Sequence, residues 1–347
     1  MVQAGSVPAR RPGPGKEHRG DRITVVQGRH HSMTTPSSAA APTVETPLFP
    51  TIEARKQRFR ADPGFDQAMR VGATTLVNQF RGSWLLNRIL NDRGRFLLSI
   101  LVLHLHFEWK LDNSKVGLTT GRLKTLCTEQ NICSPGRAGA VLATMQLLGL
   151  VEPRPTPDKR IKALSATDRL VSIHRDRWRK LFTAIRPLVP NADTTIALID
   201  DDAFLAAFVG ATVERFLAGF RVLDAAPTLW AFAERDSGVM IAVSLVLSVP
   251  PQDGSAEAAA ARVESGGIRA GISIAALAQR FSVSRSHVLG VLRAGEEAGL
   301  IARGSAAGSI VLQPLLIEAI SDFFANAFAI LTDSLATALV ATGHDAD

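Results

Sequence analysis

One stretch, residues 118–167, constrains what this chain can fold into more than any other. Thr119, or the threonine after it, can cap a first helix along which Leu123 and Leu126 supply a buried stripe. Ser134 and the proline that follows it predict the start of a second helix, because serine accepts a free amide there and proline needs no donor. Two short helices joined by a tight turn therefore open the stretch.

The second helix has two contrasting faces. Apolar residues recur at helical spacing and predict an inward face made of Ala138, Val141, Leu142, Met145 and Leu148. The opposite face carries Arg137, Ala140 and Thr144, which are small or basic. Such a face suits a helix in the major groove of DNA, since bulk would block its approach and arginine donates to guanine or phosphate.

A proline-rich segment after this helix concentrates positive charge. After Gly149 and a short extended run, it contains the basic residues Arg154, Lys159, Arg160 and Lys162. We interpret it as a short hairpin with a cationic tip, placed for phosphate or minor-groove contact. A helix-turn-helix followed by such a hairpin, or wing, is a winged helix-turn-helix.

The wing resembles that of MarR-type transcriptional regulators, in which Asp-Arg-Arg leads into Leu-x-Leu-Thr. The residues that carry the resemblance are Asp158, Lys159, Arg160, Leu164, Ala166 and Thr167. The match spans roughly residues 95–185 and departs from the family at Lys159, Ala166 and Leu170. The resemblance implies DNA binding and a homodimer interface made by the terminal helices. It also permits a small-molecule effector between those helices and the DNA-reading part, although no residue here identifies one.

The charge is divided unevenly along the chain, whose net charge is +7. Residues 53–188 carry +13, whereas residues 189–347 carry −9. We expect a disordered segment at 1–50, in which Met33 is a candidate start, and a basic MarR-like winged-helix domain at 51–188. An acidic second winged-helix-like domain with a C-terminal helix would occupy 189–347, so that a polyanion would meet only the middle of the chain.

A weak internal repeat supports the second domain. Ser134, Val141, Leu142, Gly149 and Leu150 recur 150 positions later as Ser284, Val291, Leu292, Gly299 and Leu300. The predicted fold class is therefore mainly α with small β wings, as two winged helix-turn-helix units in tandem. The second wing has only Arg303, and Glu296 and Glu297 lie late in its helix, so we expect a structural or regulatory copy.

Longer elements flank these units. Residues 96–109 are apolar nearly all round and predict a central buried helix. A helix at 167–185 would carry Arg175, Arg177, Arg179 and Lys180 outward, and Asp200, Asp201 and Asp202 would form a solvated helix start. We expect a linker at 250–271 and a long apolar helix, suited to packing or dimerisation, at 314–340.

Several other classes of protein are disfavoured. Cys127 and Cys133 are the only cysteines, which favours the reducing cytoplasm, and no secretory signal is recognised. The longest apolar runs, 96–107 and 239–249, are too short to span a membrane. His104, His106 and Glu108 are interpreted as core or boundary residues and not as metal ligands. No cofactor is expected, and no catalytic constellation indicates an enzyme.

We therefore expect a cytoplasmic transcriptional regulator that reads double-stranded DNA with the first recognition helix and the basic wing. The predicted DNA-binding residues are Arg122, Lys124, Ser134, Arg137, Thr144, Arg154, Lys159, Arg160 and Lys162. Two alternatives stay open at this point. One is a winged-helix scaffold that binds protein, and the other is a plasmid replication initiator, since those also carry tandem winged helices.

Overall fold

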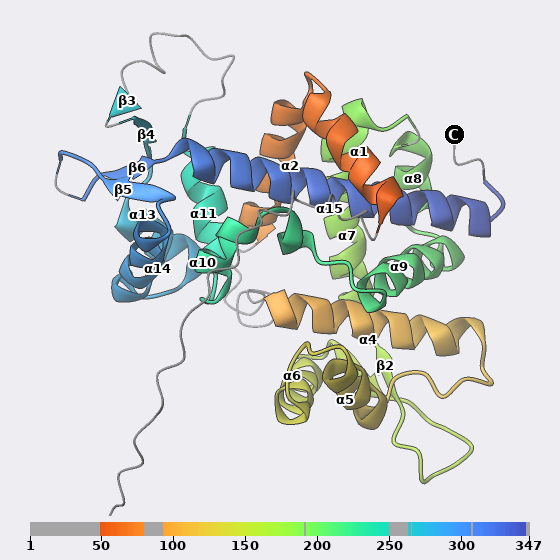
Figure 1. Cartoon of the computed structure of the whole chain (residues 1–347). Coiled ribbons are helices and arrows are strands. Elements are labelled where there is room, and N and C mark those ends of the chain that lie inside the picture. Colours follow the sequence, from red (N-terminus) through yellow and green to blue (C-terminus); the bar gives the residue numbers. More distant parts are fainter. Residues whose placement is uncertain are drawn as a thin grey trace, which may run out of the picture. The chain divides into compact units, whose positions relative to one another are not determined.

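The computed structural model describes residues 49–79, 93–190, 192–249, 263–264, 266–306 and 308–344. The chain is mostly helical (68%), and its strands form small antiparallel sheets (Figure 1). The prediction of a mainly α fold with small β elements is confirmed at this level. The predicted disordered segment 1–50 lies outside the described residues except for Phe49 and Pro50, and residues 80–92 also lie outside them.

Helices alternate with two strand-bearing regions along the chain. The helices of the first half are α1 (Pro50–Ala61), α2 (Phe65–Gln79), α4 (Arg93–Leu111), α5 (Thr120–Glu129), α6 (Pro135–Leu147) and α7 (Asp168–Ile185). Those of the second half are α8 (Ala192–Leu198), α9 (Asp202–Leu217), α10 (Trp230–Ala233), α11 (Gly238–Leu247), α13 (Ile274–Phe281), α14 (Arg285–Glu297) and α15 (Pro314–Ala341). The strands are β1 (Val151–Pro153), β2 (Leu164–Ala166), β3 (Val263–Glu264), β4 (Gly267–Arg269), β5 (Ile301–Arg303) and β6 (Ile310–Leu312). Short 3-10 turns are η1 (Arg186–Leu188), η2 (Val222–Ala225) and η3 (Pro227–Leu229).

Side-chain caps begin the paired helices of both strand-bearing regions. Thr119 accepts from the Arg122 amide at the start of α5, and Ser134 accepts from the Arg137 amide at the start of α6. Ser273 and Ser284 do the same for α13 and α14, respectively. Each oxygen satisfies an amide that has no partner within its own helix, which fixes where the helix begins.

The internal repeat is present in the backbone. The helices α6 and α14 have the same length, as do β1 and β5, and each pair is separated by 150 positions. Gly149 and Gly299 end the helices with φ angles of 65° and 69°, a region that favours glycine. The next amide closes the turn in both copies: Leu150 donates to Met145 O and Leu300 to Gly295 O, each at 2.9 Å. We call residues 118–167 the first unit and residues 263–313 the second unit.

Each unit also has a third extended segment beside its hairpin. In the first unit it is a single bridge between Thr119 and Ala163, next to the β1–β2 pair. In the second unit it is β4, so the sheet order is β3-β4-β6-β5. The prediction of a linker at 250–271 is therefore wrong for its last part, while residues 250–262 lie outside the described residues. A Cβ at Gly267 would come within 2.4 Å of Leu312 O, so β4 depends on this glycine for its close approach to β6.

The helices of the two copies pack reciprocally. The helix α1 packs on α15, and its counterpart α8 packs on α7. Likewise α4 packs on α9, and the equivalent contact is that of α11 with α2. Within the copies, the contact of α2 with α7 corresponds to that of α9 with α15. In these pairs each contact has its exchanged equivalent, as in an isologous dimer interface. Residues 46–347 form one compact unit, so the predicted boundary at 188/189 divides two copies and not two separate cores.

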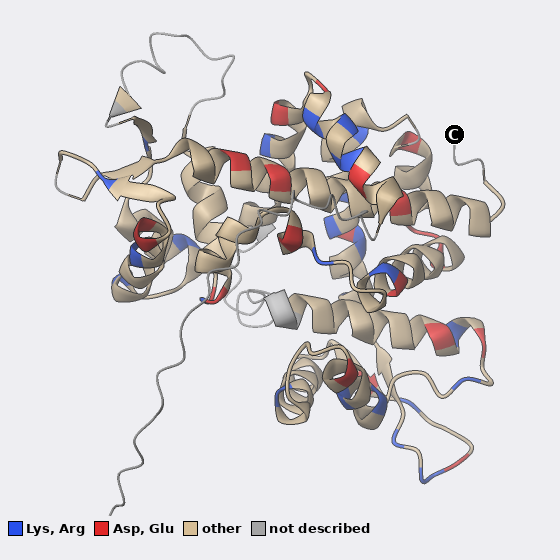
Figure 2. Cartoon of the chain, in the orientation of Figure 1, with Lys and Arg blue, Asp and Glu red and all other residues tan. Residues whose placement is uncertain are grey.

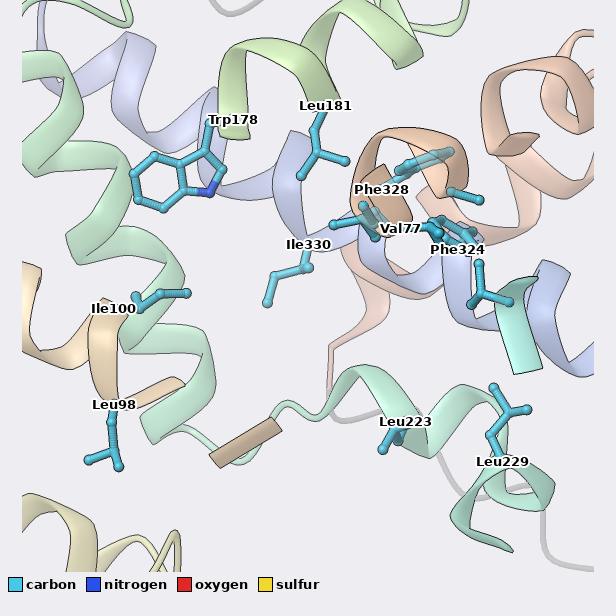
Figure 3. Packing of buried hydrophobic residues seen from close by; sticks show 14 of the residues in the cluster. Val77, Leu98, Ile100, Trp178, Leu181, Leu223, Leu229, Phe324, Phe328 and Ile330 are labelled. Carbon is cyan, nitrogen blue, oxygen red and sulfur yellow. The ribbon is translucent and has the colours of Figure 1, made fainter. Parts of the chain in front are cut away.

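The long helix α15 forms the centre of this core. Phe324, Phe328 and Ile330 of α15 meet Val77 of α2 and Leu181 of α7 (Figure 3). The sequence prediction that this helix is suited to packing is confirmed. By length and composition α15 could cross a membrane, but 67% of its most apolar window is buried inside the protein. Burial among the other helices is a sufficient physical reason for its apolar composition.

Ion pairs connect the basic first half to the acidic second half (Figure 2). Arg60 of α1 pairs with Glu318 and Asp322 of α15, the latter at 3.2 Å. Arg55 of α1 lies 3.5 Å from Asp333, further along the same helix. Much of the acid in the second half therefore neutralises helices of the first half.

Candidate nucleic-acid interface

The exposed face of α6 lies opposite its buried stripe. Ala138, Leu142 and Met145 are buried against the core, whereas Arg137 and Ala140 are exposed. Apart from the arginine, the side chains on the outer face are small over the first two turns of the helix. A helix with such a face can approach a flat or grooved surface closely, which the sequence predicts.

Thr144 and Leu147 differ from the expected recognition face. Thr144 is only half-exposed, and its hydroxyl donates to Ala140 O at 2.8 Å within the same helix. Its hydrogen is therefore used locally, which leaves it a weaker candidate for base contact. Leu147 is 86% exposed and lies two turns beyond Ala140 on the same face. The seven-residue spacing from Ala140 could have identified it from the sequence.

Ser134 and Lys124 lie at the junction of α5 and α6. The Ser134 oxygen accepts from the Arg137 amide at 3.3 Å, so its first role is to cap α6. Lys124 of α5 runs beside Gly139 of α6: a Cβ on this glycine would lie 2.9 Å from Lys124 Cε. The absent side chain lets the lysine pass along α6 and brings its ammonium group to this surface.

The tip of the β1–β2 hairpin presents three cations. Lys159, Arg160 and Lys162 are exposed, and in the described part of the chain none of them forms an ion pair with a carboxylate. Asp158 organises the turn by accepting from the Arg160 amide at 2.9 Å. Thr156 supports the same turn, since its hydroxyl donates to Asp158 O at 2.6 Å. The tip is therefore ordered by its own hydrogen bonds while its positive charge stays exposed to solvent.

An open groove separates this tip from the start of α5. Its volume is about 580 Å³, and its lining residues are Val116, Thr119, Thr120, Gly121, Arg122, Arg160, Ile161 and Lys162. The positive end of the α5 dipole and the cations of the hairpin face the same space. A groove of this composition can hold the phosphate groups of a nucleic-acid backbone.

Arg154 and Arg122 are engaged by other groups of the protein, which limits their predicted role. The Arg154 guanidinium lies 3.9 Å from the centre of the Trp109 ring and donates to Val116 O at 2.8 Å. Burial lowers the pKa of Arg154, and the side chain anchors the base of the hairpin. Arg122 pairs with Glu108 at 2.8 Å and donates to Gly117 O at 2.9 Å. The sequence could not show these partners, because Trp109 and Glu108 come from the preceding helix.

The basic residues of α7 do not add to this surface. Arg175 pairs with Asp202 at 2.6 Å, and Arg179 pairs with Asp200 at 2.6 Å. Arg177 lies 3.8 Å from the centre of the Phe96 ring, and burial lowers its pKa to about 9. The expectation of an outward side chain is therefore wrong for Arg177. Arg175 and Arg179 are partly exposed but are neutralised by these carboxylates, and Lys180 is exposed as expected.

The acidic run at the start of α9 is largely exposed and also has defined partners. Asp202 also binds Lys110 of α4 at 2.6 Å, in addition to its arginine on α7. Asp201 caps α9 by accepting from the Phe204 amide at 2.8 Å. Asp200 and Asp201 are exposed at the start of α9, so the expectation of a solvated helix start is confirmed. The ion pairs of Asp200 and Asp202 with α7 and α4 are an addition that the sequence did not show.

The histidines and cysteines near the first unit have structural surroundings. His106 is buried and its Nδ1 accepts from the Ala166 amide at 3.2 Å, which joins α4 to β2. His104 Nε2 lies 3.5 Å from Glu108, and among the described residues no group of three potential ligands could hold a metal ion. Burial, and secondarily the contact with Cys133, raises the pKa of the Cys127 thiol to about 12. A thiol of this kind is a weak nucleophile at neutral pH.

Comparisons of the chain with protein-family models, with curated proteins and with solved structures found no match.

Proposed function

We propose that this protein is a duplex-DNA-binding transcriptional regulator that contacts DNA with α6 and the β1–β2 hairpin. The observation that carries the proposal is the cationic tip of the hairpin, which borders a groove at the start of α5, the helix that packs on α6. Lys159, Arg160 and Lys162 make no ion pair within the described residues, whereas Arg175 and Arg179 are neutralised. The hairpin thus keeps three exposed positive charges on the same unit as α6, where they are available to the phosphates of a duplex.

We further propose that both units are winged helices. Their element order supports this: a helix is followed by an extended segment, two further helices and a hairpin, which is α4–α5–α6–β1–β2 in one copy. The other copy is α11–β4–α13–α14–β5–β6, with β4 beside β6. The reciprocal packing of α1 on α15 and α8 on α7 is compatible with the MarR-type resemblance. The dimer interface that the resemblance implies would then lie inside one chain, while a small-molecule effector rests on the resemblance alone.

The dependence of affinity on salt tests this function. Each phosphate contact contributes about 0.9 to the slope of log K against log salt concentration. Replacing Lys159, Arg160 and Lys162 with alanine should therefore lower the magnitude of the slope by about 3. When the salt concentration rises from 50 to 200 mM, the affinity of both proteins falls. The fold-loss of the variant should be smaller than that of the wild type by a factor on the order of 40. Fluorescence anisotropy with a labelled duplex measures this directly.

A matched control uses a cation on another face. Arg58 is exposed on α1, which Figure 1 draws on the far side of α4 from α5 and α6. Arg58→Ala should leave the slope unchanged, whereas Arg160→Ala should weaken binding to every duplex several-fold. Arg137→Ala should also relax sequence preference, because this arginine lies on the face proposed to meet bases. Equal slopes for the wild type and the triple variant would contradict the proposal.

One observation favours a second function, a scaffold that binds protein. Leu147 is 86% exposed at the end of α6, and a solvent-exposed leucine on this face suits an apolar partner surface. A wild-type protein whose binding to duplex DNA is absent or does not vary with salt would favour this alternative.

A further inference from the structure

The acidic character of the second half does not lie on its second unit. Residues 189–262 contain 4 basic and 10 acidic residues, a net charge of −6, and residues 314–347 contain 5 acidic and no basic residues. Residues 263–313, the second unit itself, contain 5 basic and 3 acidic residues, a net charge of +2. Several of the surrounding acids are paired with α1, α4 and α7. The second unit itself is therefore weakly positive, although Glu234 and Asp236 are exposed in the turn beside α14.

The exposed face of α14 carries its own donors. Arg285, Ser286 and Arg293 are exposed, while Val288 and Leu292 are buried. Residues 286 and 293 are seven apart and share one face of the helix, with Arg285 beside them in the first turn. The side chains of Arg285 and Arg293 form no ion pair with any residue that the structure describes.

A third arginine reaches this face from the turn before α11. Arg235 Nη1 lies 3.4 Å from the position that a Cβ on Gly290 would occupy. His287 Nε2 is 2.8 Å from Asp236 O, which holds the same turn against α14. The glycine thus leaves room for a guanidinium over the middle of α14, between Arg285 and Arg293.

The acids of α14 lie at its opposite end. Glu296 is engaged by Arg303 of β5 through an ion pair that includes a 3.2 Å hydrogen bond. Glu297 is exposed in the last turn, beyond the three arginines. The distribution along α14 therefore runs from basic at its N-terminus to acidic at its C-terminus, so only the first two to three turns suit a polyanion.

The two copies offer unlike surfaces at equivalent positions. The offset of 150 matches Pro135 with Arg285, Arg137 with His287 and Ala143 with Arg293. The hairpins differ as well. The loop between β1 and β2 holds three exposed cations, whereas the loop between β5 and β6 holds none among its described residues. Equivalent helices in a reciprocal packing would present two different chemical patterns to the same duplex.

We propose that α14 is a second DNA-contacting helix, so that one chain binds a site made of two unlike half-sites. This inference rests on the proposed function of the first unit. The first half-site would be held by α6 with its cationic hairpin. The second would be held by α14 through Arg285, Arg293 and the neighbouring Arg235, with little help from its hairpin. A duplex site without internal symmetry is the expected ligand.

Hydroxyl-radical footprinting on a duplex selected by the wild-type protein tests this inference. The wild type should protect two separated segments of different sequence. Arg285→Ala/Arg293→Ala should lose protection of one segment and lower the magnitude of the salt slope by about 2. The hairpin triple variant should instead lose the other segment. Arg58→Ala serves as the control, and an unchanged melting temperature verifies that each variant is folded.

The outcomes separate the two proposals. If the wild type binds with a salt slope that depends on the hairpin, but Arg285→Ala/Arg293→Ala binds and protects as the wild type does, the second helix is not a DNA contact. The first proposal would then stand alone. If the wild type binds no duplex at any salt concentration, both proposals fail together.

Discussion

Two buried histidines predict how the stability of this protein depends on pH. His106 Nδ1 accepts from the Ala166 amide and lies 3.1 Å from Ser165 Oγ, so it connects α4 to the hairpin of the first unit. Burial lowers its pKa to about 4. His174 Nε2 lies 3.0 Å from Ser99 Oγ in the core. Burial, with a smaller contribution from Arg177, lowers the pKa of His174 to about 3.

The sign follows from proton binding. An unfolded histidine has a pKa of about 6.5, so below that pH the unfolded chain binds protons that the folded chain refuses. The stability present above pH 6.5 is therefore lost as the pH falls toward 4 and then 3. At pH 5 the loss is about 2 kcal/mol for each histidine, or about 4 kcal/mol together. That is a large part of the roughly 5–15 kcal/mol that stabilises a typical protein.

Urea unfolding at pH 7.5 and pH 5.0 measures this loss. Asp112 and Asp202 have pKa values below their ordinary range, so they stay ionised and do not change the stability between these two pH values. The lowered pKa of His104 also makes the folded protein less stable at the lower pH. The glutamine in His106→Gln keeps a hydrogen-bond acceptor but does not titrate. The substitution should therefore remove about half of the pH dependence of the free energy of unfolding, however much it destabilises the protein at pH 7.5. A wild type equally stable at both pH values, or a variant with the full dependence, would refute the reasoning.

Four further substitutions test the packing and the charge pairing. Leu142→Ala should destabilise the protein by about 2–5 kcal/mol in urea unfolding, because it leaves a cavity under α6. Gly238→Ala should prevent stable folding, since its Cβ would lie 1.9 Å from Phe232 O, whereas Gly210→Ala meets nothing within 4 Å and should keep the wild-type melting temperature or raise it. Arg179→Ala should leave DNA affinity within about twofold by anisotropy, because Asp200 already holds this charge; a larger loss would assign α7 to the interface.

Local chemistry was sufficient to predict much of the first unit. Thr119 and Ser134 cap helices wherever they precede a run of helical spacing, and Gly149 ends one because it tolerates a positive φ. The tip cations could also be predicted, since a proline-rich hairpin exposes Lys159 and Arg160 whatever packs elsewhere. These features depend on residues within one or two turns of each other.

The partners of charged side chains depend on the tertiary structure and could not be predicted. Arg177 reads as an exposed cation on an amphipathic helix, but Phe96 of another helix covers it. Arg154 reads as part of the basic wing, but Trp109 lies against its guanidinium. The net charge of −9 over residues 189–347 likewise concealed that the second unit is positive. The net charge of a long segment is a sum over residues that lie on different surfaces of the folded protein, so it does not give the charge of any one surface.

Selection of bound sequences from a pool of random duplexes tests the central claim most directly. The protein is incubated with the pool at about 100 mM salt, and retained duplexes are sequenced over several rounds. The account predicts enrichment of one motif without internal symmetry, and loss of that enrichment when Lys159, Arg160 and Lys162 are replaced with alanine. Retained duplexes with the same composition as the starting pool would contradict it.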